Sequence, residues 1–198
     1  MGLNIEYIDG QTPLDEEEND GLIIKSISTQ QELDEFEQQN IEKAIQWMFN
    51  RKLNKEQLLS EKYIKNLHKK MYGDVWNWAG KFRQSEKNIG VISYLIPTSL
   101  KQLLDDCLFW IENNKYSEEE IAIRFKHRLV SIHCFSNGNG RHSRLMADLI
   151  MEKLFKKSFF TWGGSSLVKE SNARENYIKA VKLADINKIE PLISFAKS

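Results

Sequence analysis

Residues 133–144 read HCFSNGNGRHSR, which places a histidine, an aromatic residue, a Gly-Asn-Gly turn and two arginines in one short stretch. Gly138 and Gly140 have no Cβ, so the backbone around Asn139 can reach positive φ and direct consecutive N–H groups to one point. Apolar residues recur at three- and four-residue spacing over 145–154, which predicts a buried helix. The turn therefore opens a helix, and a helix N-terminus favours an anion.

Two arginines and a histidine flank this turn. Arg141 and Arg144 lie one helical turn apart and can point the same way, and two guanidiniums suit a polyphosphate better than a single carboxylate. His133 follows a predicted helix that begins with a capping box of Ser117 and Glu120. A neutral imidazole there can take a proton from an incoming hydroxyl, but a helix C-terminus favours the charged form. A histidine at a helix end is often only a cap; its combination with the turn and the arginines favours a functional site.

The same stretch resembles the signature of the Fic (Fido) family, H-x-F-x-(D/E)-G-N-G-R-x-x-R. The residues that match the signature are His133, Phe135, Gly138, Asn139, Gly140, Arg141 and Arg144. A second segment, WAGKFR at residues 78–83, is similar to another recurrent Fic segment and extends the resemblance beyond the turn. Asn137 departs from the signature, because the family has an acidic Mg²⁺ ligand at that position.

The resemblance implies a protein adenylyltransferase, since the best-known Fic proteins transfer AMP from ATP to a Ser, Thr or Tyr hydroxyl of a target protein. It implies His133 as the catalytic base and the backbone of residues 138–140 as the anion hole for the departing phosphates of ATP. Arg141 would hold a terminal phosphate, and Arg144 would support the phosphates or the loop. Phe135 would anchor the loop in the core.

Asn137 stands where the resemblance implies a ligand for Mg²⁺. An amide oxygen can bind this ion but carries no negative charge, so the affinity for Mg²⁺ should fall. Three consequences stay open: a slower reaction, a different metal or donor, or loss of activity. Asn137 also suits a turn by itself, because asparagine tolerates left-handed backbone geometry.

Several functions stay open on this scaffold. AMP transfer is preferred over the chemistry of the kinase-like Doc branch, because that branch alters the anion hole, whereas Gly138, Asn139 and Gly140 are intact here. The first alternative is transfer of another nucleotide or phosphate-linked group. The second is a catalytically weak module that binds a nucleotide or a partner protein.

The composition is that of one soluble globular domain, with 198 residues of which 41% are hydrophobic and 28% charged. The formal net charge is zero, which gives no support to a nucleic-acid or membrane partner. Cys107 and Cys134 make neither a zinc pattern nor a disulfide framework, and we find neither a signal peptide nor a membrane-spanning stretch. We therefore expect a cytoplasmic protein.

The helical periodicity and the resemblance together predict an all-α, Fic-type domain of about seven or eight helices, with a small β-hairpin flap next to the active-site loop. Residues 29–198 would form this domain. Residues 1–28, which include the acidic run DEEEND, would form an N-terminal arm that is partly mobile. We expect helices over residues 29–50 and 54–71, and a further helix from Thr98 onward.

Residues 88–97 are rich in β-favouring side chains, are broken by Gly90 and end at Pro97. At this place the resemblance implies a flap that clamps the target protein by main-chain pairing along a strand edge. An ordinary connecting hairpin is the alternative interpretation of the same residues.

Fic proteins often contain an inhibitory helix, S/T-x-x-x-E-(G/N), whose glutamate reaches the arginine that would hold the γ-phosphate. Ser28 to Glu32 matches the first five positions of this pattern, but Leu33 follows. A helix N-cap with acidic residues in the first turn explains the same residues, and we prefer that interpretation. Without an internal inhibitor, restraint would come from a separate antitoxin-like inhibitor protein, or the activity would simply be low.

Overall fold

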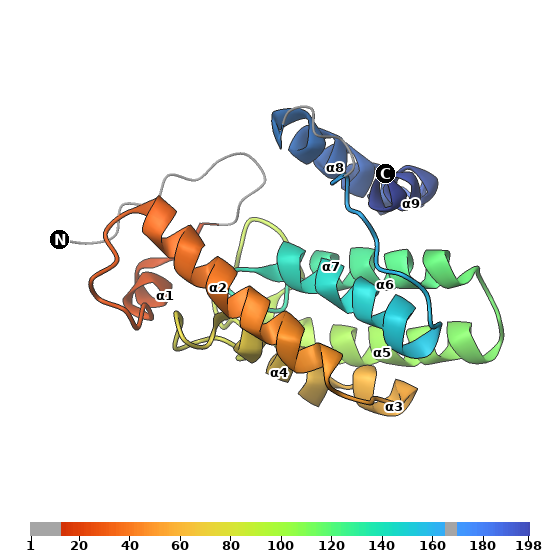
Figure 1. Ribbon diagram of the computed structural model, residues 1–198, viewed down its shortest axis with the longest axis horizontal. Helices are drawn as coiled ribbons and strands as arrows, with labels where there is room; N and C mark the ends of the chain where they lie inside the picture. Colours follow the sequence, from red (N-terminus) through yellow and green to blue (C-terminus); the bar gives the residue numbers. More distant parts are fainter. Residues whose placement is uncertain (1–12, 165–169) are drawn as a thin grey trace.

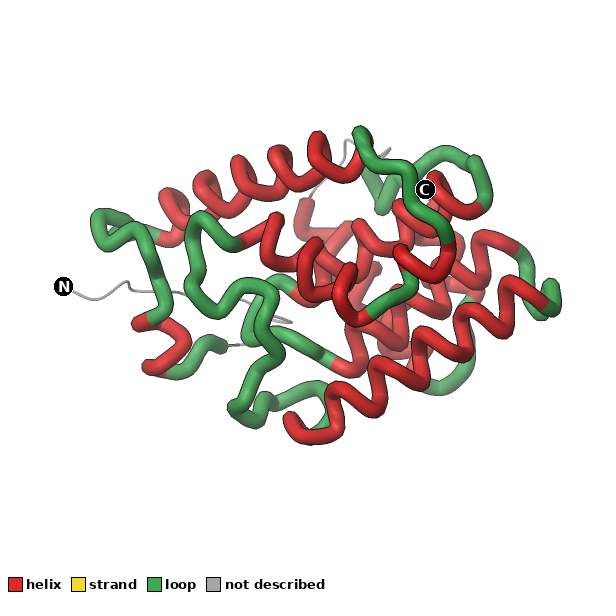
Figure 2. Tube along the Cα trace, turned by 90° about the horizontal axis from the view of Figure 1, so that it is seen from below, coloured by secondary structure: helices red, strands yellow, loops and turns green. Residues whose placement is uncertain are grey.

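The fold is entirely helical in the part of the chain that the computed structural model describes, residues 13–164 and 170–198 (Figures 1 and 2). The helices are α1 (Glu16–Asp20), α2 (Gln30–Phe49), α3 (Lys55–Leu58), α4 (Glu61–Tyr72), α5 (Ile96–Glu112), α6 (Glu118–Ile132), α7 (Asn139–Leu149), α8 (Glu170–Asp185) and α9 (Glu190–Lys197). A 3₁₀ turn (Ser93–Leu95) precedes α5, and a π-helical turn (Ile150–Leu154) follows α7. The predicted all-α class is confirmed.

Helices α6 and α7 form the centre of the molecule. Helix α6 packs against both α7 and α5, and α2 lies across α4 (Figure 1). Side chains from these helices meet in one core, of which fully buried members are Met48, Leu67, Leu103, Phe125 and Met146. Helices α8 and α9 pair with each other and contact α6 through a smaller apolar cluster that includes Ile123 and Leu192. The loop between α6 and α7 is therefore supported on several sides.

The starts of α2 and α6 follow local capping. Thr29 accepts a hydrogen bond from the Glu32 N–H, and the Glu32 carboxylate accepts one from the Thr29 N–H, so α2 begins where the sequence predicts. The Ser117 hydroxyl accepts from the Glu120 N–H, which confirms the predicted start of α6. The Glu120 carboxylate binds Arg124 instead of completing the predicted capping box.

Two other helix boundaries differ from the prediction. The helix expected over residues 54–71 is divided into α3 and α4, because the Ser60 hydroxyl donates to the Gln57 carbonyl and accepts from the Tyr63 N–H as the cap of α4. Helix α5 begins before Thr98, with Pro97 in its first turn. Proline fits there, because an N–H in the first turn has no acceptor within the helix.

The β-hairpin expected over residues 88–97 is not formed. The segment is an irregular loop that passes through the 3₁₀ turn directly into α5. Its backbone has other partners than a second strand: the Val91 N–H donates to the Ile132 carbonyl at 3.2 Å, and the Val91 carbonyl accepts from the Arg83 guanidinium. Gly90 has a φ of 107°, which a regular strand does not contain. The segment does lie beside the α6–α7 loop, as expected.

Residues 13–28 pack on the domain. The acidic run forms the short helix α1, in which Glu18 is buried and its carboxylate binds Ser85 and Lys87. Leu22 then forms an isolated antiparallel bridge with Trp76. The rest of the predicted arm, residues 1–12, lies outside the described residues. None of the helices described for this chain has both the length and the apolar character needed to cross a membrane.

Candidate active site

The side chain of Asn139 closes the loop between α6 and α7. Its Oδ1 accepts from the Phe135 N–H at 2.9 Å, and its Nδ2 donates to the Phe135 carbonyl at 2.7 Å. Phe135 is fully buried, and its ring stacks on His68 with 3.7 Å between the ring centroids. Because the Asn139 amide is used in this way, the backbone of Asn139 is the part that can face a ligand.

His68 also holds this loop in place, which agrees with the structural role expected for it from the sequence. The Gly80 N–H donates to its Nδ1 at 3.0 Å, so the ring proton resides on Nε2, which donates to the Asn137 carbonyl at 3.0 Å. Burial lowers the pKa of His68 well below 6.5, so the ring keeps this neutral tautomer. His68 precedes the WAGKFR segment by ten residues, and this nearness to a recurrent Fic segment is the feature of the sequence that points to His68.

Gly138 and Gly140 serve the loop in different ways. Gly138 has a φ of 76°, which disfavours any residue with a Cβ. An added Cβ would also lie 2.5–2.7 Å from atoms of the Tyr72 side chain, so backbone conformation and space both require glycine here. Gly140 lies in the first turn of α7, and an added Cβ would meet no described atom within 4 Å. The first N–H groups of a helix have no acceptor within it. An open helix N-terminus therefore lies at the predicted anion site.

His133 is buried, and its φ of 57° ends α6 in a left-handed conformation. Neither ring nitrogen has a hydrogen-bond partner among the described residues; the Val130 carbonyl is near enough to favour the charged ring, without normal hydrogen-bond geometry. Burial first, and then the charge of Arg83, lower the pKa of His133 to about 4. The imidazole is therefore neutral at pH 7, although the C-terminus of a helix by itself favours the charged form.

Arg141 is engaged by an acidic residue of α2. Its Nη1 lies 2.7 Å from Oε2 of Glu37, and its guanidinium lies 5.1 Å from the centre of the Tyr72 ring. Glu37 is nearly inaccessible and is fixed by a second contact, because its Oε1 accepts from Trp76 Nε1 at 2.7 Å. A phosphate at Arg141 would therefore share the guanidinium with Glu37.

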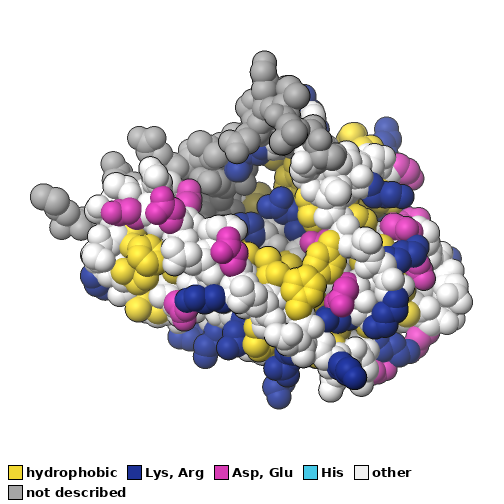
Figure 3. Space-filling model, in the orientation of Figure 1, with side chains coloured by type: hydrophobic (Ala, Val, Ile, Leu, Met, Phe, Trp, Pro, Cys, Tyr) yellow, Lys and Arg dark blue, Asp and Glu magenta, His cyan; other side chains and the backbone are white. Residues whose placement is uncertain are grey.

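Arg144 lies beside Tyr177 of α8, which also contacts a second basic residue. The Arg144 guanidinium is 5.6 Å from the centre of the Tyr177 ring, and Lys126 Nζ donates to the Tyr177 hydroxyl at 2.6 Å. Lys126 is fully buried, and burial followed by the charge of Arg144 lowers the pKa of Lys126 to about 7. No motif marks Lys126, so the sequence analysis missed it. Basic side chains gather in the hollow on this face of the molecule, between α2 and the α8–α9 pair (Figure 3).

The family model described as Fic/DOC matches residues 58–151, a range that extends from the end of α3 through the α6–α7 loop into the π-helical turn. Residues 58–151 belong to the Fic/DOC family. The Fic signature and the WAGKFR segment both lie within this range. The resemblance inferred from the sequence is therefore confirmed.

Relatives of this Fic domain include proteins named as adenylyltransferases. The protein adenylyltransferase Fic of Aedes aegypti is 25% identical over 147 residues, which are 72% of this chain and 28% of that protein. A Fido domain-containing protein of Dictyostelium discoideum is 37% identical over 71 residues, which are 36% of this chain and 44% of that protein. The matched region thus spans less than half the length of both relatives.

Solved Fic structures share the fold. BepC of Bartonella tribocorum, solved with bound AMPPNP, superposes with a TM-score of 0.67 at 16% identity over 92% of this chain and 97% of that one. Fic-1 of C. elegans superposes with a TM-score of 0.63 at 21% identity over 80% of this chain and 46% of that one. At these identities the likeness establishes the Fic fold alone.

Glu32, the glutamate of the weak inhibitory-helix match, acts as a helix cap in this chain. Its carboxylate accepts from the N–H groups of Ser28 and Thr29 at 2.9 and 3.1 Å, as the preferred interpretation of these residues requires. The glutamate that reaches an arginine of the signature is Glu37, five residues later on α2. Sequence reasoning missed Glu37 because Leu33, rather than Ser or Thr, stands four residues before it.

The Asn137 position does not fit a Mg²⁺ site built on a protein carboxylate. The Asn137 Oδ1 accepts from the Gly138 N–H at 2.5 Å, so the amide oxygen is already bonded to the backbone of the turn. Within residues 13–164 and 170–198, no three His, Cys, Asp or Glu side chains form a group that could hold a metal ion. Mg²⁺ in proteins is usually held by one or two carboxylates together with substrate phosphates. At residue 137 the chain offers one neutral oxygen.

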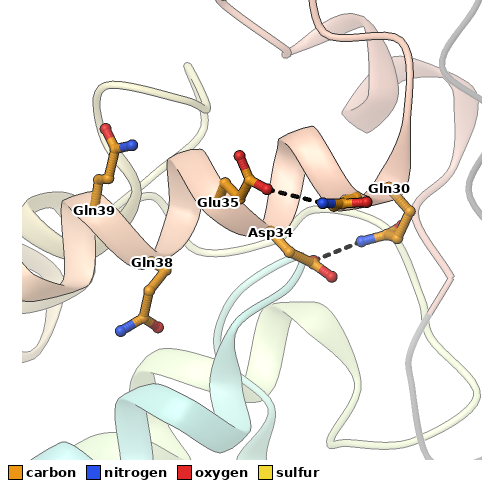
Figure 4. A pocket seen from close by; sticks show the side chains of 6 residues that line it. Gln30, Asp34, Glu35, Gln38 and Gln39 are labelled. Carbon is orange, nitrogen blue, oxygen red and sulfur yellow. Dashed lines mark hydrogen bonds between the residues drawn. The ribbon is translucent and has the colours of Figure 1, made fainter.

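A hollow of about 720 Å³ lies along α2, but its lining does not suit catalysis (Figure 4). All of its lining side chains come from one helix, and they bond to one another: Gln30 donates to Asp34 at 2.7 Å, and Gln31 donates to Glu35 at 3.1 Å. Asp34 adds negative charge near Arg141. This hollow is an open helix face beside the site rather than the site itself.

Proposed function

We propose that this Fic protein is a protein adenylyltransferase that transfers AMP from ATP to a Ser, Thr or Tyr hydroxyl of a target protein. The observation that carries the proposal is a neutral, buried His133 beside the open N-terminus of α7 at Gly140. Arg141 and Arg144 add positive charge to the first two turns of α7. The names of the relatives and the AMPPNP bound by BepC, which has the same fold, support a nucleotide as the substrate.

The proposed reaction uses His133 as the base. A ring nitrogen accepts the proton of the target hydroxyl, and the hydroxyl oxygen forms a bond to the α-phosphorus of ATP. The bond between this phosphorus and the oxygen that bridges to the β-phosphate breaks, and pyrophosphate leaves with the electron pair. The N–H groups of residues 138–140, with Arg141 and Arg144, offset the negative charge on the phosphates.

The target protein would dock along residues 88–97. Apolar side chains are exposed there, at Ile89, Ile92, Tyr94 and Leu95. This segment is a loop rather than a strand, and both backbone groups of Val91 are already bonded, so the target would pair with other backbone groups of the loop. A separate antitoxin-like inhibitor protein remains a prediction of the family resemblance.

The test is incubation with α-labelled or γ-labelled ATP, a cell lysate, and Mg²⁺ or Mn²⁺, with His133→Ala as the control. Label that enters a protein from the α-position alone, and is absent with His133→Ala, is the expected result. Label from the γ-position would mean kinase chemistry and would overturn the proposal.

Labelled UTP and GTP in the same assay, and calorimetry with ATP, separate the two alternatives. Label from α-labelled UTP or GTP, with none from ATP, would favour transfer of another nucleotide. No label with either metal, together with retained binding of ATP in calorimetry, would favour a catalytically weak binding module. The observation that favours a weak binding module is the hydrogen bond from the Gly138 N–H to the Asn137 side-chain oxygen, which occupies the expected Mg²⁺ ligand.

A further inference from the structure

Arg83 is a buried arginine outside the signature that contacts the backbone of His133. It is 2% exposed, and its Nε donates to the His133 carbonyl at 2.7 Å. Its backbone N–H donates to the Cys134 carbonyl at 3.0 Å. These bonds hold the chain where His133 adopts positive φ. A non-glycine residue keeps such a conformation only when its surroundings fix it.

The remainder of the guanidinium holds the segment that lies over His133, residues 85–91, which we call the cover loop. Nη1 donates to the Ser85 carbonyl at 2.8 Å, and Nη2 donates to the Val91 carbonyl. Between these two points Gly90 lies against the start of the His133 side chain, since a Cβ built on Gly90 would lie 2.6 Å from the His133 Cβ. One planar side chain therefore joins both ends of the cover loop to the residue beneath it.

Several charges face the His133 ring. Arg83 and Lys87 disfavour the imidazolium, and Glu18 of α1 favours it. Lys87 and Glu18 are paired with each other, so their effects on the ring oppose one another. Glu86 lies 3.7 Å from the Arg83 guanidinium, but its side chain is mostly exposed and therefore screened by solvent. After burial, Arg83 is the strongest influence that keeps the ring uncharged.

We propose that Arg83 is a positioning residue that fastens the cover loop to the backbone of His133 and keeps the imidazole enclosed until the loop is displaced. This inference rests on the proposed function, because the proposed function makes the His133 ring the catalytic base. Both ring nitrogens are buried, and Gly90 of the cover loop lies against the His133 Cβ, so in this proposal the loop moves before a target hydroxyl reaches the ring. Docking of a target on the cover loop would then expose the base at the same time.

The test uses the full chain without nucleotide or target, so it does not depend on transferase activity. The ring signals of the four histidines are followed by NMR from pH 3 to 8, and His133 is assigned with His133→Gln. Amide hydrogen exchange of the cover loop is measured in parallel. The variants are Arg83→Met, Arg83→Lys and Gly90→Ala, and Lys81→Met is the control, because Lys81 is exposed in the same segment.

We expect Arg83→Met to raise the midpoint of the His133 titration by roughly one pH unit and to speed exchange in the cover loop, because a charge and the burial are both reduced. Arg83→Lys keeps the positive charge but loses the planar guanidinium that binds both Ser85 and Val91. Amide exchange in the cover loop should therefore speed up, with a smaller change in the His133 midpoint. Gly90→Ala should raise the midpoint while the Arg83 charge is retained, because the added Cβ would push the cover loop away from both the His133 Cβ and the Arg83 Nη2, at 2.6 and 2.8 Å.

If Arg83→Met does not fold, the other two variants carry the test. Folded variants in which neither the His133 midpoint nor the cover-loop exchange differs from Lys81→Met would overturn the proposal, even with a lowered melting temperature. Failure of ATP labelling in the unmodified protein would overturn the proposed function and leave these results standing.

Discussion

Asn137 and Asn139 have the same side chain two positions apart, and their surroundings give them different tasks. The Asn139 amide binds both the N–H and the carbonyl of Phe135, which closes the loop. The Asn137 amide oxygen binds only the neighbouring Gly138 N–H, and the Asn137 carbonyl accepts from His68. Residue type alone does not separate these tasks, because the difference comes from what each side chain meets.

Replacement of Gly138 by alanine should destabilise the fold. The positive φ costs about 1–2 kcal/mol for a residue with a Cβ, and the contact with Tyr72 adds about 1–3 kcal/mol. Gly140→Ala is the matched control, because its Cβ meets open space and should leave the unfolding free energy within about 1 kcal/mol of the original. Urea unfolding measures both. Equal losses in the two variants would contradict this account of the turn.

Replacement of Asn137 by aspartate should raise the rate of transfer in Mg²⁺. A carboxylate adds the negative charge that the amide lacks, and Mg²⁺ prefers such a ligand. The measurement is the initial rate of label transfer, together with the affinity for ATP with and without Mg²⁺. No gain in either quantity would mean that residue 137 does not limit the site.

At the scale of helices, α2 brings a carboxylate to the site through the Glu37–Arg141 ion pair. Glu37→Gln should keep the bond from Trp76, since an amide oxygen accepts it, and release the Arg141 charge for phosphate. We expect ATP to bind about fivefold more tightly, which corresponds to about 1 kcal/mol for a pair in which Glu37 is buried and Arg141 is partly exposed. Calorimetry measures the affinity, and Glu35→Gln on the exposed face of α2 is the control. Weaker binding would show instead that Glu37 orients Arg141.

At the scale of the whole molecule, three buried neutral histidines determine the response to acid. The pKa values of His133 and His142 are lowered to about 4 and that of His68 well below 6.5, in each case mainly by burial. The unfolded chain therefore binds more protons than the folded chain below pH 6.5. The unfolding free energy should be highest above about pH 6.5 and fall by several kcal/mol toward pH 4. Urea unfolding from pH 7 to 4.5 tests this, and a constant value would contradict it.

Asp148 affects the pH dependence of stability in the opposite direction. This residue connects α7 to residues 160–162 by hydrogen bonds. Burial raises the pKa of Asp148 to about 6, although Trp162 Nε1 and the Phe160 N–H donate to its carboxylate. The folded chain binds this proton more readily than the unfolded one, so its contribution to stability grows as pH falls through about 6 to 4. Asp148→Asn should therefore steepen the acid loss of stability. A weaker dependence of the unfolding free energy on pH in this variant would show that the Asp148 carboxyl does not stabilise the fold in acid.

Local patterns were sufficient for some features of the whole molecule. The helical class, the start of α2 at Thr29, the start of α6 at Ser117 and the turn at Gly138 follow from periodicity, caps and backbone freedom, which act over a few residues. The Fic family follows from the residues of one short stretch, and the match to residues 58–151 confirms it.

Contacts between distant segments decided the rest. The pKa of His133 is lowered because the ring is buried and because the charge of Arg83, fifty residues earlier in the chain, disfavours the imidazolium. Glu37 reaches Arg141 only because α2 packs across α4, and residues 88–97 form no strand because Arg83 and Ile132 bind the backbone of Val91. The sequence by itself thus determined which chemical groups are present and which helices carry them. The tertiary structure decided their charge and access, because burial and long-range hydrogen bonds depend on packing rather than on local sequence.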